Sequence, residues 1–241
     1  MIIYNTISQN REGEIMAKII FSGVALLVLL SLMLTSSGCC EGTCTTGTQT
    51  ELEPVEIREY EGINLSSVDD FRENSIKGPQ QVDIQDYHLI VDGLVSKPLS
   101  LTYDAVLDGY QHYKKVVTLY CVEGWSATIL WEGISVRELI EAASLSPDAE
   151  VVIFHAYDGY TTSLPVDYIM NNDIIMAFKM NEVNLPPERG FPFQLVAESK
   201  WGYKWIKWLT RIELSDDINY HGFWESRGYS NNADLDKSFI E

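Results

Sequence analysis

Short runs in which apolar and polar residues alternate predict a domain built mainly from short strands. Six segments have this pattern and predict strands: residues 87–91, 115–120, 150–156, 174–180, 193–197 and 205–214. Ser135 and Glu138 match a capping box, which predicts a helix that runs to Ala143, and Pro165 predicts a second helix over residues 166–170. The helices are too few and too unevenly spaced for a doubly wound sheet, so the pattern indicates a mixed α+β fold in a single domain.

An uncharged apolar segment precedes this domain and predicts an exported leader over residues 1–38. Lys18 comes directly before residues 19–38, which carry no charged side chain and end in small residues. This order is typical of a signal peptide, although an apolar segment of this length also spans a bilayer as a membrane anchor. Met16 gives the leader a more ordinary start, so we hypothesise that residues 1–15 result from a misassigned start site.

The end of the leader bears on how the protein is held after export. Cys39 follows small residues, as in lipoprotein signals, but Ser36 stands where such signals usually have Leu. Both a lipidated Cys39 and an uncleaved helix would attach the protein to the membrane outside the cytoplasm. Residues 39–61 are small, polar and rich in Thr, which predicts a flexible tether. The folded domain is expected over residues 62–229, followed by an acidic tail over residues 230–241.

The composition indicates a folded, acidic domain. Of the 241 residues, 46% are hydrophobic and 11% are aromatic, which is enough to build a core. The 17 Lys and Arg residues face 35 Asp and Glu residues, so the formal net charge is −18. Binding to a phosphate backbone needs clustered cations, and this balance therefore excludes nucleic acid as a partner.

The candidate chemistry centres on one cysteine. Three of the four cysteines lie in or beside the leader, and Cys121 alone lies in the predicted domain. It ends a predicted strand and precedes Glu123, Gly124 and Trp125, a loop position typical of functional residues. The alternative is a buried structural thiol, although an unpaired thiol in an exported protein is exposed to oxidation.

A second feature is a cluster of lysines and aromatic residues over residues 200–208. Lys200, Lys204 and Lys207 lie there among four aromatic residues, and Arg189 precedes them beside a Gly-Pro turn. Cations and aromatic faces suit an anionic, planar, phosphate-bearing ligand. An amphipathic strand with lysines extended over an apolar core is the alternative. The four histidines are scattered, and no short metal-binding spacing, nucleotide-binding loop or serine-nucleophile motif occurs.

These features together resemble the sulfite-oxidase-type molybdopterin-binding domain, over residues 62–229. The matching motifs, in chain order, are Tyr87-x-Leu89-x-Val91-x-Gly93, Cys121-Val122-Glu123-Gly124-Trp125-Ser126, Asp158-Gly159-Tyr160-Thr161-Thr162-Ser163-Leu164, Gly190-Phe191-Pro192, Gly202-Tyr203-Lys204-x-x-Lys207-Trp208 and Gly222-Phe223-Trp224-Glu225. The order and spacing of these motifs make the resemblance specific. Within the family, the chain is similar to the bacterial periplasmic methionine-sulfoxide reductase catalytic subunit and to uncharacterised prokaryotic relatives.

The resemblance implies a mixed-sheet molybdopterin-binding fold with a molybdenum–molybdopterin cofactor. Cys121 stands where the family's thiolate ligates molybdenum, and Lys207 stands where a lysine binds the phosphate of the pterin. Further cofactor contacts are implied at Asn74, Ser75, His155, Ala156, Arg189, Gln194, Lys204, Trp205 and Ile206. The resemblance also implies a substrate pocket lined by Trp125, Tyr160 and Tyr203, with the first two and the cysteine as catalytic residues.

The chain departs from the family pattern at two places. Many members carry Arg where this chain has Gln194, and we hypothesise that Arg189 supplies the missing charge. Sulfite oxidases have arginines soon after the cysteine to hold a dianion, whereas residues 122–125 here are acidic and apolar. Because the charge of a site should complement its ligand, a neutral S-oxide or N-oxide is the expected substrate instead of sulfite.

The sequence therefore predicts an exported molybdenum–pterin oxidoreductase that transfers an oxygen atom to or from a small molecule. No haem or flavin module is evident, so a separate redox partner is expected to supply electrons. The alternative is a tethered binding module that retains the fold without the cofactor, which Gln194 favours and Cys121 with Lys207 disfavours. Cofactor-free thiol chemistry lacks a neighbouring base, because His112 and His155 are distant from the cysteine in sequence.

Overall fold

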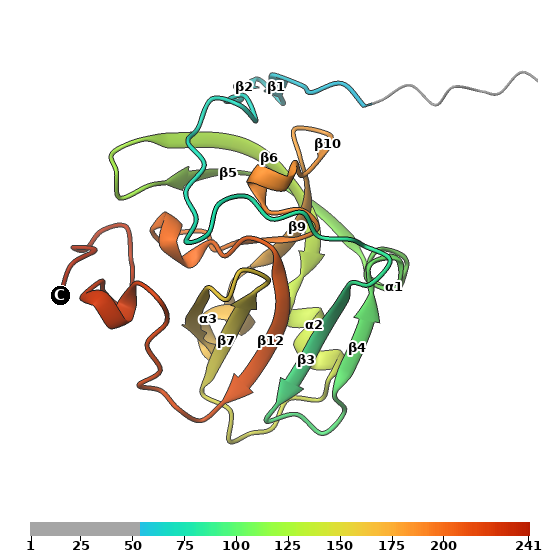
Figure 1. Cartoon of the computed structure of the whole chain (residues 1–241), viewed down its shortest axis with the longest axis vertical. Helices are drawn as coiled ribbons and strands as arrows, with labels where there is room; N and C mark the ends of the chain where they lie inside the picture. Colours follow the sequence, from blue (N-terminus) through green and yellow to red (C-terminus); the bar gives the residue numbers. More distant parts are fainter. Residues whose placement is uncertain (1–53) are drawn as a thin grey trace, which may run out of the picture. The chain divides into compact units, whose positions relative to one another are not determined.

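The computed structural model describes residues 54–241, whose main elements are two five-stranded sheets. The first sheet is antiparallel throughout, with strands in the order β10-β9-β6-β5 and β11 also paired with β9 (Figure 1). Its strands are β5 (His112–Tyr120), β6 (Ser126–Ser135), β9 (Ile175–Met180), β10 (Val183–Asn184) and β11 (Gln194–Val196). The β5–β6 hairpin pairs Tyr120 with Ser126, and the loop between these two residues carries Cys121. The hairpin thus fixes the position of the cysteine.

The second sheet mixes parallel and antiparallel pairs in the order β4-β3-β12-β7-β8. Its strands are β3 (His88–Gly93), β4 (Leu99–Thr102), β7 (Val151–Ala156), β8 (Thr161–Pro165) and β12 (Leu209–Ser215). Strand β12 runs parallel to β3 and antiparallel to β7, and the remaining pairs are antiparallel. A two-stranded hairpin of β1 (Glu59–Tyr60) and β2 (Ile63–Asn64) precedes both sheets.

The helices are short, and all but the last of them lie between strands in the chain. They are α1 (Tyr103–Gly109), α2 (Val136–Ala142), α3 (Val166–Asn171) and the 3-10 turns η1 (Pro187–Arg189), η2 (Gly202–Lys204) and η3 (Glu225–Arg227). The Ser135 side chain accepts a hydrogen bond from the Glu138 N–H at 3.4 Å, which confirms the predicted cap of α2. Pro165 precedes α3, as predicted. Few helices beside a mixed sheet confirm the α+β class.

One hydrophobic core contains buried side chains from both sheets. Trp131 of β6 and Phe154 of β7 are both fully buried within it. The Trp131 indole donates a hydrogen bond to the Val117 carbonyl at 3.2 Å, which satisfies its buried N–H. Its ring also packs edge-on against Trp205, with 5.8 Å between ring centroids. Trp205 lines the cavity described below, so the core directly supports that cavity.

The strand predicted over residues 205–214 is shorter than expected, because β12 begins only at Leu209. Trp205 caps the end of η2, and Trp208 has a φ angle of +50°, a left-handed conformation that interrupts an extended chain. The sequence pattern also did not predict β4, α1 or β6. Residues 205–208 therefore form a turn in front of β12 and line the cavity. The Ile206 carbonyl in this turn accepts a hydrogen bond from the Leu195 N–H of β11 at 2.9 Å.

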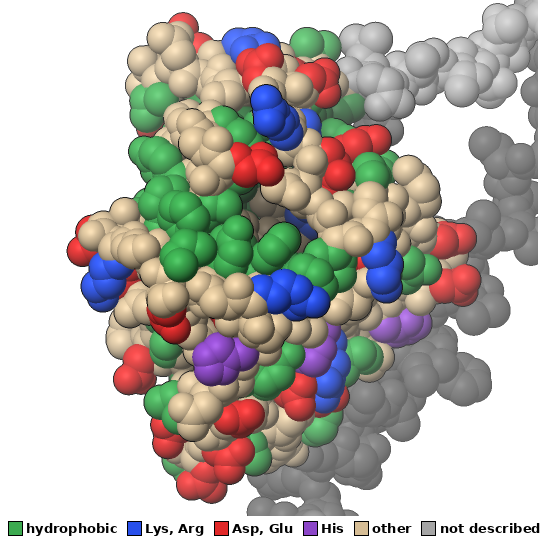
Figure 2. Space-filling model, turned by 60° about the vertical axis from the view of Figure 1, so that its left-hand side comes forward, with side chains coloured by type: hydrophobic (Ala, Val, Ile, Leu, Met, Phe, Trp, Pro, Cys, Tyr) green, Lys and Arg blue, Asp and Glu red, His purple; other side chains and the backbone are tan. Residues whose placement is uncertain are grey.

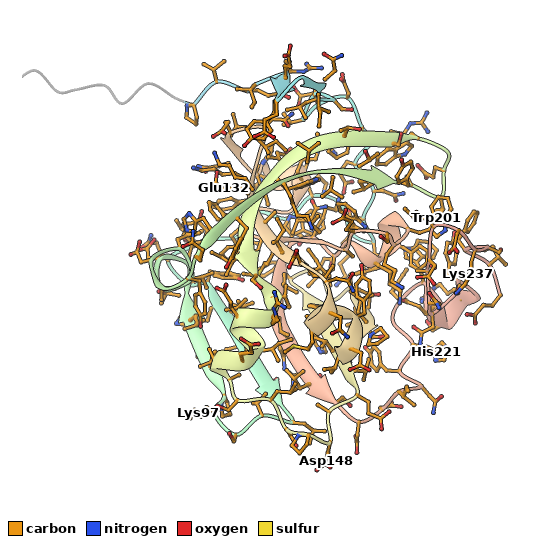
Figure 3. All side chains as sticks on the ribbon, turned by 180° about the vertical axis from the view of Figure 1, so that it is seen from behind. Lys97, Glu132, Asp148, Trp201, His221 and Lys237 are labelled. Atoms are coloured by element: carbon orange, nitrogen blue, oxygen red, sulfur yellow. The ribbon has the colours of Figure 1, made fainter. Side chains whose placement is uncertain are left out.

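The two ends of the described segment pack against the domain. Residues 230–241, predicted to be a polar tail, include Ala233, which is fully buried. Trp201 packs against Phe239 at 5.5 Å and donates to the Lys237 carbonyl at 3.3 Å, and Trp201 and Lys237 lie close together in Figure 3. The predicted leader, Cys39 and most of the predicted tether lie outside the described residues. None of the helices formed by residues 54–241 has both the length and the apolar character needed to cross a bilayer.

Candidate functional site

A cavity of about 230 Å³ opens beside the end of β5. Six segments contribute to its lining, within residues 71–76, 119–125, 158–160, 188–194, 202–208 and 224–229. Figure 2 shows the hollowed face, where hydrophobic side chains gather along one side of the opening and Lys or Arg side chains lie near its rim. The cavity is thus built from segments that are far apart in the sequence.

Cys121 lies in the wall of this cavity and is only 8% exposed. Its N–H donates to the Trp125 carbonyl at 2.9 Å, and its carbonyl accepts from the Gly124 N–H at 3.0 Å, which closes a tight turn. Burial raises the pKa of the Cys121 thiol and the charge of Glu123 adds to this, while a hydrogen bond from the Glu123 backbone and the charge of Arg72 oppose it. Within residues 54–241 this thiol is the one free cysteine. It is therefore a single soft ligand placed at a cavity.

Aromatic side chains form one wall of the cavity. Trp125, Tyr160 and Tyr203 line it as predicted, together with Trp224 and Tyr229, which the sequence analysis did not assign to the site. The Tyr160 hydroxyl donates to the Tyr203 carbonyl at 2.5 Å, and burial raises the pKa of Tyr160 well above its usual value. The raised pKa keeps the Tyr160 hydroxyl protonated, and the hydrogen bond to the Tyr203 carbonyl holds its proton. Tyr160 therefore contributes a neutral aromatic surface to the site.

A further part of the cavity lining comes from residues 68–76, which we call the strap. Five of its side chains line the cavity: Phe71, Arg72, Asn74, Ser75 and Ile76. The Ser75 hydroxyl is buried and has no hydrogen-bond partner in the described part of the chain. No motif in the sequence predicted a role for Arg72, yet its charge is close enough to lower the pKa of the Cys121 thiol. The strap thus brings a cation and an unpartnered hydroxyl to the cavity.

Arg189 ties the strap to the rest of the domain. Its Nε donates to the Val68 carbonyl at 2.8 Å, and its Nη2 donates to the Phe71 carbonyl at 2.5 Å. The guanidinium carbon also lies 4.1 Å from the centre of the Phe71 ring. Arg189 and Gln194 both line the cavity. The Nε and Nη2 donors of Arg189 are thus both bonded to the strap. The hypothesis that Arg189 supplies the charge missing at Gln194 stays a prediction.

Lys207 lies on the cavity wall next to the strap, where its cation has several partners. Its Nζ is 2.6 Å from Oε1 of Glu73 and 3.3 Å from the Glu188 carbonyl. The same atom lies 4.5 Å from the centre of the Trp208 ring. Burial lowers the pKa of Lys207, and the pairing with Glu73 opposes this shift. Trp205 and Ile206 line the cavity beside it.

Three predicted cofactor residues do not line the cavity. His155 lies on β7 with its Nε2 at 2.8 Å from the Glu213 carboxylate. Lys204 is fully buried, with its Nζ at 2.6 Å from the Glu225 carboxylate. Ala156 accepts a hydrogen bond from the Gly159 N–H at 3.0 Å and so shapes the turn before Tyr160. The remaining predicted contacts, Asn74, Ser75, Arg189, Gln194, Trp205, Ile206 and Lys207, are brought together around Cys121.

Gly190 allows the Arg189 turn to approach Lys207. It has a φ angle of +99°, and a methyl group on it would lie 3.0 Å from Cβ and 3.1 Å from Cα of Lys207. We expect Gly190→Ala to displace Lys207 and to destabilise the protein by about 1–3 kcal/mol, the usual effect of overpacking. The matched control is Gly62→Ala, which has a φ angle of +80° but no atom within 4 Å of the added methyl group. Equal losses of melting temperature in the two variants would show that the close approach to Lys207 does not matter.

The residues around the cavity fit a metal held by an organic cofactor. Among residues 54–241, no group of three His, Cys, Asp or Glu side chains could hold a metal ion. A metal bound through Cys121 would therefore need further ligands from a cofactor, for which soft sulfur donors are suitable. The unpartnered Ser75 hydroxyl and the Lys207 ammonium supply a polar contact and a positive charge for such a group.

Comparison with known proteins gives a consistent match. Residues 76–224 match the family model of the oxidoreductase molybdopterin binding domain. The chain is 34% identical to an uncharacterized oxidoreductase, YuiH, of Bacillus subtilis, over 65% of this chain and 78% of that protein. It is 26% identical to the protein-methionine-sulfoxide reductase catalytic subunit MsrP of Campylobacter jejuni, over 68% of this chain and 60% of that protein.

A solved structure has a similar fold. The sulfane dehydrogenase SoxCD from Paracoccus pantotrophus aligns with a TM-score of 0.60 at 19% identity, over 82% of this chain and 59% of that chain.

The putative protein-methionine-sulfoxide reductase subunit YedZ1 of Azospira oryzae is 30% identical over 63% of this chain and 57% of that protein. This chain thus spans less than two thirds of several relatives that it matches.

Proposed function

Because this chain belongs to the oxidoreductase molybdopterin binding domain family, we propose that it is an exported enzyme that removes oxygen from a neutral S-oxide or N-oxide. The observation that carries the proposal is the placement of Cys121. Its thiol lies in the wall of a cavity that also contains the Lys207 ammonium, the unpartnered Ser75 hydroxyl and an aromatic wall. These groups are the ones that a metal–pterin cofactor and a weakly polar substrate require.

The residues of the cavity suggest how the cofactor is held. Cys121 would ligate the molybdenum, and Lys207 would bind the phosphate group of the pterin. Asn74 and Ser75 would contact the pterin from the strap, and the unpartnered Ser75 hydroxyl would gain a hydrogen bond there. When bound, the molybdenum centre supplies two-electron oxygen-atom exchange, which no side chain of the protein can perform alone.

The charge and surface of the cavity favour a neutral substrate. Trp125, Tyr160 and Tyr203 provide an apolar wall, and Glu123 places a negative charge beside the cysteine. Arg72 can donate a hydrogen bond to the oxygen of an S-oxide, but a single exposed arginine is a weak site for a sulfite dianion. Reduction of an S-oxide consumes two electrons and two protons, breaks the S–O bond and yields a thioether and water. A separate redox partner would deliver the electrons.

The proposed location outside the cytoplasm rests on the start of the chain. Residues 19–38 are uncharged and apolar, follow Lys18 and precede Cys39. Either a lipidated Cys39 or an uncleaved helix would hold the enzyme at the membrane surface. Ligation to a metal would also protect the single domain thiol, Cys121, from oxidation in that compartment.

The full chain, produced in a host that makes molybdopterin, tests the proposal. We expect molybdenum near one atom per chain and reduction of methyl phenyl sulfoxide by a reduced viologen dye. Sulfite oxidation should be slower by about tenfold or more in kcat/KM, the equivalent of 1.4 kcal/mol of lost charge complementarity. Stoichiometric molybdenum with sulfite oxidation alone would disprove the substrate assignment. A folded protein without molybdenum or pterin would favour the alternative, a binding module without cofactor.

A further inference from the structure

The first part of the strap is anchored by the buried side chains of Val68 and Phe71, and two cations attach the strap further. Between residues 72 and 77, no backbone N–H donates a hydrogen bond to another group of the described chain, and no helix or strand forms there. Arg189 holds the first part of the strap through the carbonyls of Val68 and Phe71. Lys207 holds the middle of the strap through Glu73. The segment from residue 72 onwards can therefore move if the Glu73–Lys207 contact is broken.

The two partners of that contact are shielded from water. The side chains of Lys207 and Glu73 are 16% and 26% exposed, and their charged atoms are 2.6 Å apart. Lys207 is also the predicted phosphate-binding residue. A phosphate group carries between one and two negative charges near pH 7, and one ammonium group cannot neutralise both it and a carboxylate at contact distance.

We propose that Glu73 is a positioning residue that occupies Lys207 in the cofactor-free protein and is displaced when the phosphate of the cofactor binds. This inference rests on the proposed function, which places the phosphate at Lys207. The displacement of Glu73 releases residues 72–77, while Arg189 keeps residues 68–71 attached through its two hydrogen bonds. The strap thus opens at one end when the phosphate arrives, which gives the pterin access to Ser75.

Inorganic phosphate, titrated into cofactor-free full-length protein by calorimetry, is the probe. We expect Glu73→Gln to bind phosphate about tenfold more tightly than the original protein, because phosphate no longer has to displace a carboxylate. The matched control is Glu188→Gln, which removes the same charge from the cavity wall but not the side-chain partner of Lys207. Its affinity should stay within about threefold of the original protein, since that carboxylate is not in contact with the ammonium.

Limited digestion with trypsin provides a readout that does not depend on activity, because Lys77 is a cleavage site at the end of this segment. Phosphate should speed cleavage after Lys77 in the original protein and leave cleavage after Arg58 unchanged. In Glu73→Gln, cleavage after Lys77 should be fast even without phosphate. Glu73→Asp keeps the charge but has a shorter side chain, so its cleavage rate should lie between those of the original protein and Glu73→Gln, which guards against a folding defect in the amide variant.

The outcomes separate this inference from the proposed function. If Lys207→Ala abolishes phosphate binding but Glu73→Gln behaves like Glu188→Gln, the displacement of Glu73 is refuted and the phosphate site stands. If Lys207→Ala binds phosphate as well as the original protein does, the phosphate is not at Lys207, and both its assignment to Lys207 and the displacement of Glu73 fail, whereas the proposed function is still decided by the molybdenum content of the full chain. An unchanged rate of cleavage after Lys77 on phosphate binding would also refute the displacement.

Discussion

Replacement of Cys121 by Ser should leave the protein folded and remove nearly all of its molybdenum. Serine is almost the same size as cysteine, so the turn closed by the Trp125 carbonyl and the Gly124 N–H should survive. Its hydroxyl, however, is a hard and weakly acidic donor, whereas a thiolate is a soft ligand. Residues 54–241 contain no cluster of three potential metal ligands, so the described part of the chain offers no alternative site that could retain the metal.

Elemental analysis of the purified full-length variant measures this effect directly. We expect molybdenum per chain to fall by about tenfold or more, as the loss of a first ligand exceeds the 10–100-fold effect of losing a supporting contact. Val122→Ala is the matched control, since it trims a neighbouring cavity residue and keeps the thiol. Circular dichroism checks that both variants are folded. A full complement of molybdenum in the serine variant would show that Cys121 is not a ligand.

Local sequence signals predicted the position of Cys121 well. The alternating pattern before it predicted the end of β5, and the short loop that follows contains a glycine with a φ angle of +87° at Gly124. The capping residue of α2, Ser135, was predicted for the same reason, because a cap depends on residues a few positions apart. These features are set by neighbours in the chain, and the sequence displays such neighbours directly.

Contacts between distant segments could not be predicted in this way. The Glu73–Lys207 pair and the Arg189 bonds to the strap join residues more than one hundred positions apart. Neither partner shows a pattern that identifies the other. Strand β6 was missed because nearly all its residues from Ala127 onwards are buried on both faces, so the alternation typical of a half-buried strand is absent.

The left-handed conformation of Trp208 is a further feature that tertiary contacts impose against the local sequence pattern. The sequence around it alternates like a strand, but its N–H donates to the Gly190 carbonyl at 3.2 Å and its indole donates to the Pro187 carbonyl at 2.7 Å. These contacts hold the chain against the Arg189 turn, which places Lys207 at the cavity. Tertiary contacts also determine the direction of His155. It lies on a correctly predicted strand, but its side chain contacts Glu213 instead of lining the cavity.

Removal of the Glu225 carboxylate should cause the largest loss of stability in the domain. Glu225 and Lys204 form an ion pair with 2.6 Å between Oε1 and Nζ, and both side chains are fully buried. Thr162 donates to the same carboxylate oxygen at 2.5 Å, and Lys204 also donates to the Ser163 carbonyl at 2.9 Å. Burial lowers the pKa of Lys204, and the charge and hydrogen bond of Glu225 oppose this shift. Glu225→Ala leaves that charge buried without its partner.

We expect Glu225→Ala to lower the free energy of unfolding by about 3–5 kcal/mol, the usual result of breaking a buried pair on one side. Equilibrium denaturation in urea, followed by tryptophan fluorescence, measures the loss. The double variant Lys204→Met/Glu225→Leu should recover most of it, because apolar side chains of similar size need no charge partner. Arg58→Met is the control, since Arg58 and Asp70 form a pair whose side chains are 54% and 62% exposed and whose loss should cost less than about 1 kcal/mol.

The same pair supports the aromatic wall of the cavity, so its loss should also reach the site. Lys204 ends η2 directly after Tyr203, and Glu225 begins η3 directly after Trp224. Both of these aromatic residues line the cavity. Glu225→Ala should therefore expose their rings to a fluorescence quencher such as acrylamide below the urea concentration at which the domain unfolds. If stability falls but quenching is unchanged, the pair stabilises the fold without positioning the wall. If the loss of stability is below about 1 kcal/mol, water reaches the ammonium group and the pair is not isolated from solvent.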